Sequence, residues 1–415
     1  MIKRILANML FLFLPFAAGA QFMYSYSSSV NSMQMVLNDD WQQPPVMRLG
    51  GSDVLHFSFD EMSHRYCRFL YRVTHCNAAW EPSGLFDIDF IEGFNNLPIE
   101  EWENSKNTTV QYTNYAFTIP NENMGLKLSG NYIVEIFPDD DSNMAIAQYR
   151  FFVVEPHVAF EASVSGNTEI DFNRAHQQVA FTVHHPRYKI NNPASEVVAV
   201  VYQNGRMDNA ATGIAPAYID MSGNKLQYIY NEKLVFAGGN EYRRFELVDP
   251  NVPGMNVEHV SYEEPYYHAM LYTDEARSTH SSYKDENGRY FVNTVEGYGT
   301  DIEADYVYVH FTLDAPRLQG GHYSLFGGLS YNAFGEENIM EYDEECGVYR
   351  VSRLLKLGLY NYCYVWVPDD SERAFTAPVE GDFFNTDNEY LVLLYHREFA
   401  SRYDKLIGAG LLNRK

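Results

Sequence analysis

Tyr306-Val-Tyr-Val-His-Phe-Thr-Leu313 places valine, phenylalanine and leucine at every second position. Successive side chains of an extended strand point to opposite faces, so this spacing predicts a strand with one buried face. Similar runs of β-branched and aromatic residues recur at 66–73, 132–137 and 197–202, separated by clusters of Asn, Gly, Asp and Pro. Helical spacing is nearly absent, and the one candidate helix covers residues 399–412. The sequence therefore predicts an all-β protein.

Proline-bearing junctions divide the predicted strands into modules. Residues 148–154 form an apolar run typical of a closing strand, and Glu155-Pro156 ends it. A new β pattern starts near Val158, and Glu303-Ala-Asp-Tyr306 opens another. Repeated β-sandwiches of immunoglobulin or carbohydrate-module type are the natural architecture for such a series. We therefore expect three consecutive β-sandwich domains after a signal peptide, with the boundaries 1–20, 21–156, 157–302 and 303–415.

The N-terminus has the three parts of a secretory signal peptide. Lys3-Arg4 makes it positive, residues 5–16 are apolar with few interruptions, and Ala18-Gly-Ala20 supplies the small residues that signal peptidase needs. The apolar run is shorter than the roughly 20 residues that span a bilayer. We expect cleavage between Ala20 and Gln21, and no lipid anchor, because Gln21 is not a cysteine. The mature protein is then expected in the periplasm.

Composition indicates packed domains with an acidic surface. Hydrophobic residues make up 46% of the 415 residues, which is enough for several cores and excludes general disorder. The formal charge is −25, and removal of Lys3 and Arg4 with the signal peptide makes it −27. Such a surface repels nucleic-acid phosphates and anionic lipid headgroups. We therefore expect no nucleic-acid partner and no direct insertion into a membrane.

A row of aromatic residues near the C-terminus is the candidate ligand platform. Residues 348–355 and 359–367 flank Lys356-Leu-Gly358, which predicts a β-hairpin with Gly358 in its turn. On the second strand one face carries four aromatic side chains, Tyr360, Tyr362, Tyr364 and Trp366. Flat rings of this kind stack against sugars. The alternative is that the row packs against a neighbouring module or the second sheet of its own module.

The four cysteines are expected to be free thiols. Cys67 and Cys76 lie in one extended stretch, too far apart for the roughly 7 Å limit between the Cα atoms of a disulfide. In the predicted hairpin register Cys363 lies opposite Val351, and Cys346 lies beyond its reach. Neither pair has metal-site spacing.

Other polar clusters give no defensible catalytic, cofactor or metal site. The acidic runs 139–141 and 369–370 follow prolines between strands and lack the spacing of a calcium loop, so we expect solvated loops. His184-His185 lacks the helical frame of a zinc site. A hydrolase with a carboxylate pair among Asp87, Asp89 and Glu92 remains an open alternative. We expect no enzyme, no cofactor and no small-molecule ligand.

A series of short motifs resembles one known family. The first module carries the clearest ones: Thr74-His-Cys76, Trp80 and Phe90-Ile-Glu-Gly-Phe-Asn95. Further motifs follow in order along the chain, namely Glu103-Asn-Ser105, Tyr112-Thr-Asn-Tyr115, Leu126-Lys-Leu-Ser-Gly-Asn-Tyr132, Gln203-Asn-Gly205, Phe236-Ala-Gly-Gly-Asn-Glu-Tyr242, Leu354-Leu-Lys356, Tyr360-Asn-Tyr362, Phe383-Phe384, Glu389-Tyr390 and Arg402-Tyr403-Asp404. Together they resemble the plug protein of the type IX secretion system.

The resemblance implies a non-enzymatic periplasmic protein of Bacteroidetes-type bacteria. Such a plug binds the periplasmic end of the outer-membrane translocon barrel and closes it, so the barrel is the expected partner and holds the protein peripherally at the outer membrane. The third module also resembles a glycogen-binding-type sandwich, but Gly327-Gly-Leu-Ser-Tyr-Asn332 lacks the tryptophan that stacks on sugar in that family. A carbohydrate-binding protein of the periplasm or cell surface is the second reading.

Overall fold

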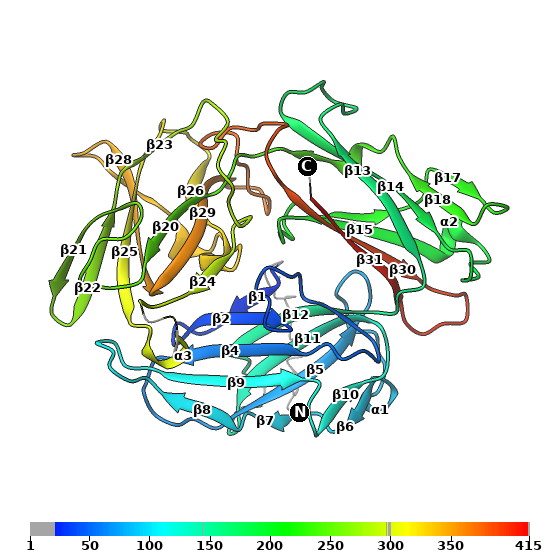
Figure 1. The fold of residues 1–415 in the computed structure, drawn as a ribbon, viewed down its shortest axis with the longest axis horizontal. Coiled ribbons are helices and arrows are strands. Elements are labelled where there is room, and N and C mark those ends of the chain that lie inside the picture. Colours follow the sequence, from blue (N-terminus) through cyan, green and yellow to red (C-terminus); the bar gives the residue numbers. More distant parts are fainter. Residues whose placement is uncertain (1–20, 143, 296, 298–299, 414–415) are drawn as a thin grey trace, which may run out of the picture.

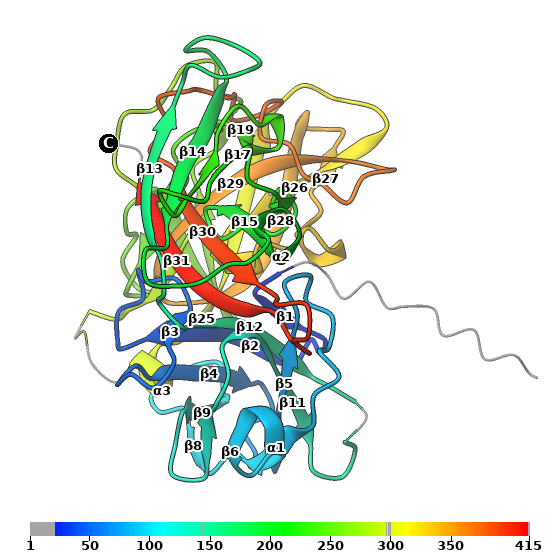
Figure 2. The ribbon, with the colours of Figure 1, turned by 90° about the vertical axis from the view of Figure 1, so that its right-hand side faces the viewer.

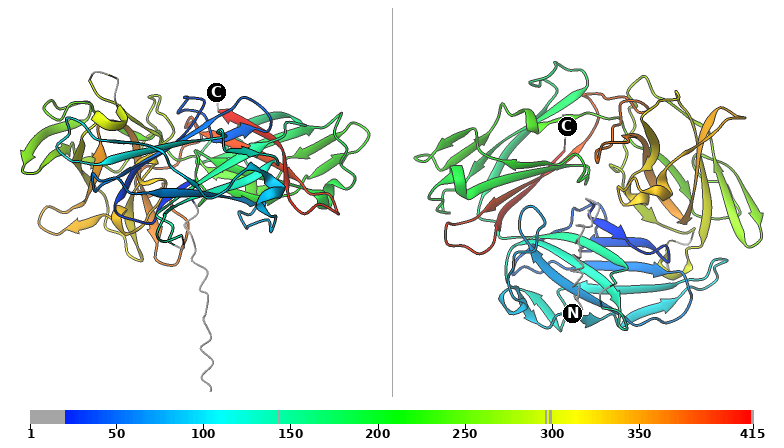
Figure 3. Two further views of the ribbon diagram at one scale, coloured as in Figure 1. Left: turned by 90° about the horizontal axis from the view of Figure 1, so that it is seen from below. Right: turned by 180° about the vertical axis from the view of Figure 1, so that it is seen from behind.

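The computed structural model describes residues 21–142, 144–295, 297 and 300–413. Nearly all regular structure is β, and the sheets pair into three sandwich modules with separate cores (Figure 1). The predicted all-β class is confirmed. The predicted signal peptide, residues 1–20, and cleavage after Ala20 lie outside the described residues. Figure 3 shows from below and from behind that the modules lie side by side in one layer.

The N-terminal module packs two mainly antiparallel sheets around one aromatic core, with β3 parallel to β12. The first sheet has the order β1-β12-β11-β5-β7, with β3 beside β12, and consists of β1 (Met23–Ser25), β3 (Val46–Arg48), β5 (Phe69–Cys76), β7 (Leu97–Pro98), β11 (Gly130–Pro138) and β12 (Ala147–Val154). The second has the order β2-β4-β9-β8 and consists of β2 (Val30–Leu37), β4 (Leu55–Glu61), β8 (Glu101–Asn104) and β9 (Thr113–Ile119). A small corner holds α1 (Asp87–Phe90), β6 (Ile91–Gly93) and β10 (Met124–Leu126).

Alternation explains how β4 joins this core. Leu55, Phe57 and Phe59 point inward and are buried. The Phe57 ring stacks on Phe117 of β9, with 4.9 Å between ring centroids, and meets Tyr149 of β12 edge to face at 5.2 Å. The cross-strand and cross-sheet pairs together hold the two sheets face to face.

The middle module combines strands from two distant parts of the chain. One sheet has the order β13-β14-β18-β17, with β19 beside β14, and consists of β13 (Ala159–Ser165), β14 (His176–His184), β17 (Tyr218–Asp220), β18 (Lys225–Tyr228) and β19 (Val235–Ala237). The other has the order β16-β15-β30-β31 and consists of β15 (Val197–Gln203), β16 (Ala211–Ile214), β30 (Glu389–His396) and β31 (Lys405–Asn413). Two short helices, α2 (Pro193–Glu196) and η1 (Glu232–Leu234), complete it.

The C-terminal module is inserted between those two parts. One sheet joins β20 (Arg243–Leu247), β29 (Gly358–Pro368) and β24 (Tyr290–Val292), and β26 (Gly321–Phe326) also pairs with β29. The facing sheet joins β21 (Val257–Glu263), β22 (Tyr266–Leu271), β23 (Asp274–Glu275), β25 (Tyr306–Asp314), β27 (Glu341–Asp343) and β28 (Val348–Lys356). Its short helices are η2 (Gly328–Ser330) and η3 (Glu336–Asn338), and α3 (Thr300–Glu303) precedes β25.

The strands are not divided between the modules at the predicted boundary between residues 302 and 303. β30 pairs with β15 from Val197 opposite His396 to Gln203 opposite Tyr390, so the last strands return to the middle module (Figure 2). The candidate helix at 399–412 is wrong, because 405–413 is β31. Local alternation identifies strands, but it does not say which distant strand will pair with them. The middle module is therefore discontinuous in the sequence, and only the strand pairing reveals this.

The predicted hairpin around Gly358 is also wrong. β28 pairs with β25 and β27, whereas β29 pairs with β20, β24 and β26 in the facing sheet. The connection through Leu357 is therefore a corner between sheets. Gly358 is needed for close approach rather than for a turn: a Cβ there would lie 2.3 Å from the Phe291 carbonyl oxygen. The four cysteines are free, as predicted, and Cys363 lies opposite Phe326 instead of Val351.

Candidate functional site

The aromatic row of β29 lies inside the C-terminal module. Tyr360, Tyr362 and Tyr364 are buried, and only Trp366 is partly exposed. The Tyr360 ring stacks between Phe245 and Tyr290, with centroids 5.1 and 5.3 Å away. Those two rings belong to neighbouring strands of the same sheet, whereas the Tyr362 ring meets Phe311 of β25 in the facing sheet edge to face at 5.1 Å. The row therefore packs against its own second sheet, which is the alternative that the sequence left open. It offers no open platform for a sugar.

A buried charge cluster lies beside that row and was not found from the sequence. Asp274 accepts hydrogen bonds from the hydroxyls of Tyr362 and Tyr364 at 2.8 and 2.9 Å. Arg243 donates to Asp274 at 2.6 Å and to Glu380 at 2.9 Å. Burial opposes the charge of the guanidinium, but the two carboxylates outweigh it and raise the pKa of Arg243. Each of these three charged groups has a partner of opposite charge.

The junction between the N-terminal and C-terminal modules centres on a buried ion pair. Lys356 at the end of β28 lies 2.7 Å from Asp60 of β4, and both side chains are almost completely buried. The Tyr306 hydroxyl donates to Asp60 at 2.6 Å, and Asn114 donates to it at 2.8 Å. Burial raises the pKa of Asp60, and the Lys356 ammonium opposes that shift. The Lys356 Nζ also lies 4.3 Å from the ring centroid of Tyr112.

Backbone contacts extend this junction along its length. The Asp305 carboxylate accepts the backbone N–H groups of Thr109 and Val110 at 2.7 and 3.0 Å. At the other end, Tyr290 donates to the Met33 carbonyl at 2.6 Å, and the Met33 N–H donates to the Tyr331 hydroxyl at 3.0 Å. Modules joined by such paired polar groups have a defined relative position.

The junction between the N-terminal and middle modules is aromatic and apolar. Buried side chains of β12 meet those of β15, β30 and β31 there, and the set comprises Phe152, Val154, Val200, Tyr202, Leu391, Leu393, Tyr395 and Leu406. Trp80 packs on Phe152 at 5.2 Å between ring centroids and donates to the Tyr202 hydroxyl at 3.2 Å. This contact resembles a domain core more than a transient interface.

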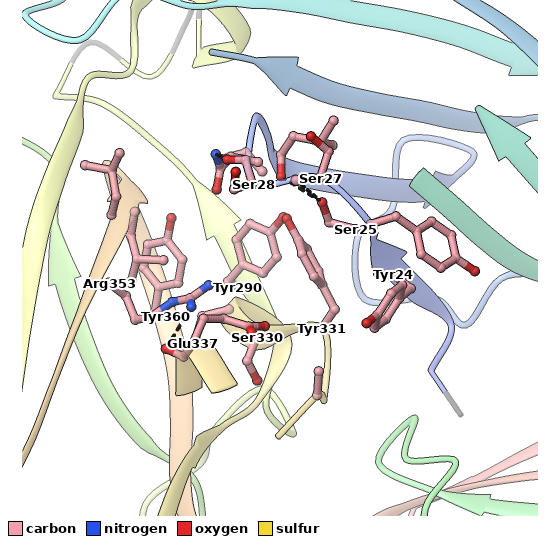
Figure 4. A pocket seen from close by; sticks show the side chains of 18 of the residues that line it. Tyr24, Ser25, Ser27, Ser28, Tyr290, Ser330, Tyr331, Glu337, Arg353 and Tyr360 are labelled. Carbon is pink, nitrogen blue, oxygen red and sulfur yellow. Dashed lines mark hydrogen bonds between the residues drawn. The ribbon is translucent and has the colours of Figure 1, made fainter. Parts of the chain in front are cut away.

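A pocket of about 590 Å³ opens at the edge of the polar junction (Figure 4). Its first wall is the segment 24–32, which joins β1 to β2 and carries Tyr24, Ser25, Ser27 and Ser28. Its second wall comes from the C-terminal module, through Tyr290, Tyr331, Glu337, Arg353 and Tyr360. Figure 4 shows side chains of both walls facing the same space. The lining mixes aromatic rings, hydroxyls, one guanidinium and the Glu337 carboxylate.

The acidic and histidine candidates from the sequence serve local structure. Asp89 accepts the Phe86 N–H at 3.0 Å, and Asp87 accepts a hydrogen bond from Asn95 at 3.1 Å, so both hold the α1 corner, while Glu92 is exposed on β6. His185 pairs with the carbonyl of Tyr188 at 2.9 Å.

The α1 corner exposes three large apolar side chains. Phe86, Ile88 and Phe94 are 72%, 77% and 70% exposed. The backbone beneath them is fixed, because the Asn95 side chain both donates to and accepts from the Val73 backbone at 2.9 Å. Gly93 has a φ of +100°, and a Cβ there would lie 2.1 Å from the Asn123 carbonyl oxygen. We call these three residues the α1 apolar surface. Rigid, exposed apolar groups of this kind mark contact sites for other proteins.

The important residues that sequence reasoning missed are single charges. Asp60 falls at a position where alternation within β4 places the side chain on the outward face, and only a different module buries it. Arg353 likewise sits in an ordinary strand pattern. No local signal distinguishes these positions from solvated ones.

Comparisons with known proteins place the chain among secretion components. Residues 30–155 match the family described as type 9 secretion system plug protein 1st domain. A crystal structure of a hypothetical protein from Parabacteroides merdae is 38% identical in sequence, with a TM-score of 0.92. The match covers 95% of this chain and 99% of that one. No curated protein matches.

Proposed function

The chain belongs to the family of type 9 secretion system plug proteins, and on that premise we propose that it is a periplasmic stopper. In this proposal the mature protein begins at Gln21 and binds the periplasmic end of the outer-membrane translocon barrel. It closes the barrel when no substrate is passing, and the barrel alone holds it at the outer membrane. The family is a secretion component and not a known enzyme family, and we propose that this member has no catalytic role.

The observation that carries this proposal is the joining of three sandwiches into one body. Both junctions of the N-terminal module are buried, one through aromatic packing and one through the pair of Asp60 and Lys356. A barrel wide enough for folded cargo leaks solutes unless the stopper keeps its shape. Close-packed interiors resist compression, so a body without loose joints suits that task. No helix in the described part of the chain is long and apolar enough to cross a membrane.

The α1 apolar surface is the proposed anchor on the barrel. A seal that must open for each cargo needs a reversible contact, in which a few apolar side chains supply most of the affinity within a polar rim. Phe86, Ile88 and Phe94 are rigidly presented, and the acidic residues Asp87, Asp89 and Glu92 lie between them in the sequence. The α1 apolar surface therefore has the composition expected of a reversible contact.

Uptake of a large antibiotic by whole cells tests the stopper. Deletion of the gene in cells that retain the barrel should increase uptake, and the wild-type gene should restore exclusion. The triple variant Phe86→Ser, Ile88→Ser, Phe94→Ser should fold but fail to restore it, and should no longer co-purify with the barrel.

A matched control removes three other exposed side chains from the middle module. Tyr218, Met221 and Tyr230 are 56%, 52% and 74% exposed, so Tyr218→Ser, Met221→Ser, Tyr230→Ser should restore exclusion fully. Unchanged uptake in the deletion strain, with open barrels present, would disprove the stopper. Equal failure of both triple variants would disprove the α1 anchor.

A further inference from the structure

The first residues of the proposed mature chain lie in the junction between the N-terminal and middle modules. Gln21 is 8% exposed, and its buried side-chain oxygen has no hydrogen-bond partner. The Phe22 ring packs on two aromatic rings of that junction, with centroids 5.6 Å away at Phe152 and 5.3 Å away at Tyr202. The Phe22 carbonyl oxygen accepts the Arg150 backbone N–H at 2.7 Å, which fixes the backbone there. A mature chain that starts at Gln21 therefore has its first residue in a packed region.

A free α-amino group is poorly suited to this position. It carries a positive charge at neutral pH, and burial disfavours a charge that has no partner. The junction already holds the buried guanidinium of Arg150, which lies 5.4 Å from the centroid of the Trp80 ring. Among the residues that the structure describes, no carboxylate pairs with this guanidinium, and burial lowers the pKa of Arg150. An ammonium at Gln21 would add a second desolvated cation to the same junction.

An N-terminal glutamine can remove that charge without any other reactant. Its neutral α-amino nitrogen attacks the side-chain amide carbon Cδ and forms a five-membered lactam, pyroglutamate. The N–Cδ bond forms and the Cδ–Nε2 bond breaks, while Nε2 takes one proton from the amine and leaves as ammonia. The lactam is neutral and keeps a single N–H donor. The open form has the N–H donors of both an ammonium and an amide, all of which would need partners in a buried site.

We propose that Gln21 is a modification site, which cyclises to pyroglutamate after the signal peptide is removed and packs in the junction as an uncharged terminus. Cyclisation comes before the terminus docks, because the side chain is enclosed once the junction has formed. The modification removes a terminal charge, as N-terminal acetylation does in other proteins. This inference rests on the proposed start of the mature chain at Gln21, but not on the stopper role.

Peptide mass spectrometry tests the modification on protein purified from cells that export it with its own signal peptide. Trypsin releases residues 21–48 as the N-terminal peptide, because no lysine or arginine lies between Gln21 and Arg48. This peptide should be lighter than the unmodified sequence by the mass of one ammonia molecule. A synthetic peptide of the same sequence, labelled with heavy isotopes and added before digestion, should stay uncyclised and controls for cyclisation during handling. Treatment with pyroglutamyl aminopeptidase should leave a peptide that begins at Phe22.

Gln21→Asn is the matched variant, since asparagine keeps a side-chain amide but would need a strained four-membered ring to cyclise. Its free amine should lower the thermal midpoint by roughly 1–3 °C relative to the cyclised wild type. The difference should shrink as the pH rises from about 7 to 9, because the amine then loses its charge. The loss of one methylene would instead give the same difference at both pH values. The neighbouring titratable groups, Arg150, Tyr26 and Cys76, are identical in the two chains.

The possible results separate this inference from the proposed function. A free amine at Gln21 in the exported wild type would overturn the modification and leave the stopper role as it stands. A chain that begins at another residue would overturn both the modification and the proposed start of the mature chain. A difference between Gln21→Asn and the wild type that does not change with pH would overturn the role of an uncharged terminus in the junction.

Discussion

The N-terminal module meets its two neighbours through junctions of opposite chemistry. Against the middle module it presents Phe152 and Trp80, which pack on Tyr202 and further apolar side chains. Against the C-terminal module it presents Asp60, which pairs with Lys356. Tyr306 hydrogen-bonds to Asp60, and the Tyr112 ring lies beside the Lys356 ammonium. One junction resembles a hydrophobic core, and the other resembles a buried polar network.

The two junctions contribute differently to the structure. Buried apolar area stabilises in proportion to its size, about 25 cal/mol per Å², and tolerates small shifts in position. A buried ion pair adds little net stability, yet loss of one partner is severe because the remaining charge is unpaired. We infer that the aromatic junction holds the modules together, whereas the polar junction sets their relative position.

Lys356→Met should give the largest effect of any single change at the junctions. It leaves the Asp60 carboxylate buried without its cation, which lowers the free energy of unfolding by about 3–5 kcal/mol. Urea unfolding of the mature chain measures this. The double variant Asp60→Leu, Lys356→Met removes both charges and should recover most of the loss. A double variant no more stable than Lys356→Met would contradict the charge argument.

Phe152→Ala should break the aromatic junction with a comparable but smaller loss. Its ring is fully buried between Trp80 and Phe22, with centroids 5.2 and 5.6 Å away, so truncation leaves a cavity. We expect about 3–4 kcal/mol in the same assay. Phe94→Ala removes an exposed ring as the control and should change stability by less than about 0.5 kcal/mol. Similar losses from both would contradict this packing.

The free energy of unfolding should also depend on pH through Asp285 of the C-terminal module. Burial raises the pKa of Asp285 from 3.8 to about 7, although the Asn287 N–H opposes the shift. The folded state thus holds a proton that the unfolded chain releases, and this stabilisation is lost as pH rises through 7. From pH 5 to 8 the free energy of unfolding should fall by about 2–3 kcal/mol. Asp285→Asn should remove that fall, and an unchanged slope would contradict the assignment.

Tyr395→Phe should give the smallest effect, and it sharpens the picture of the aromatic junction. The Tyr395 hydroxyl donates to the Asn131 side-chain oxygen at 2.6 Å, one of the direct polar contacts there. Its loss should lower the free energy of unfolding by about 1–2 kcal/mol, the usual range for one buried hydrogen bond. Thermal unfolding measures it. A loss as large as that of Phe152→Ala would mean that this junction depends on polar pairing after all.

Local pattern predicted the class and the free cysteines, but not the pairing of distant strands. Alternation in 306–313 marks β25 correctly, since period-two burial is a local property. The same rule predicted that β28 and β29 form a hairpin. In the structure the chain turns a corner at Leu357, so the two strands lie in different sheets. It also could not identify Asp60, which is buried by a module far away in the sequence. Burial that depends on long-range packing leaves no local trace.

Coupling between the modules can be measured by hydrogen exchange of the mature chain, followed by mass spectrometry. Peptides from β4 in the N-terminal module and β25 in the C-terminal module should exchange with the same opening free energy, because the junctions make one body. Asp60→Asn, a change confined to the N-terminal module, should lower both values together. Loss of protection in β4 alone, with β25 unchanged, would mean that the modules open independently and that no rigid stopper exists.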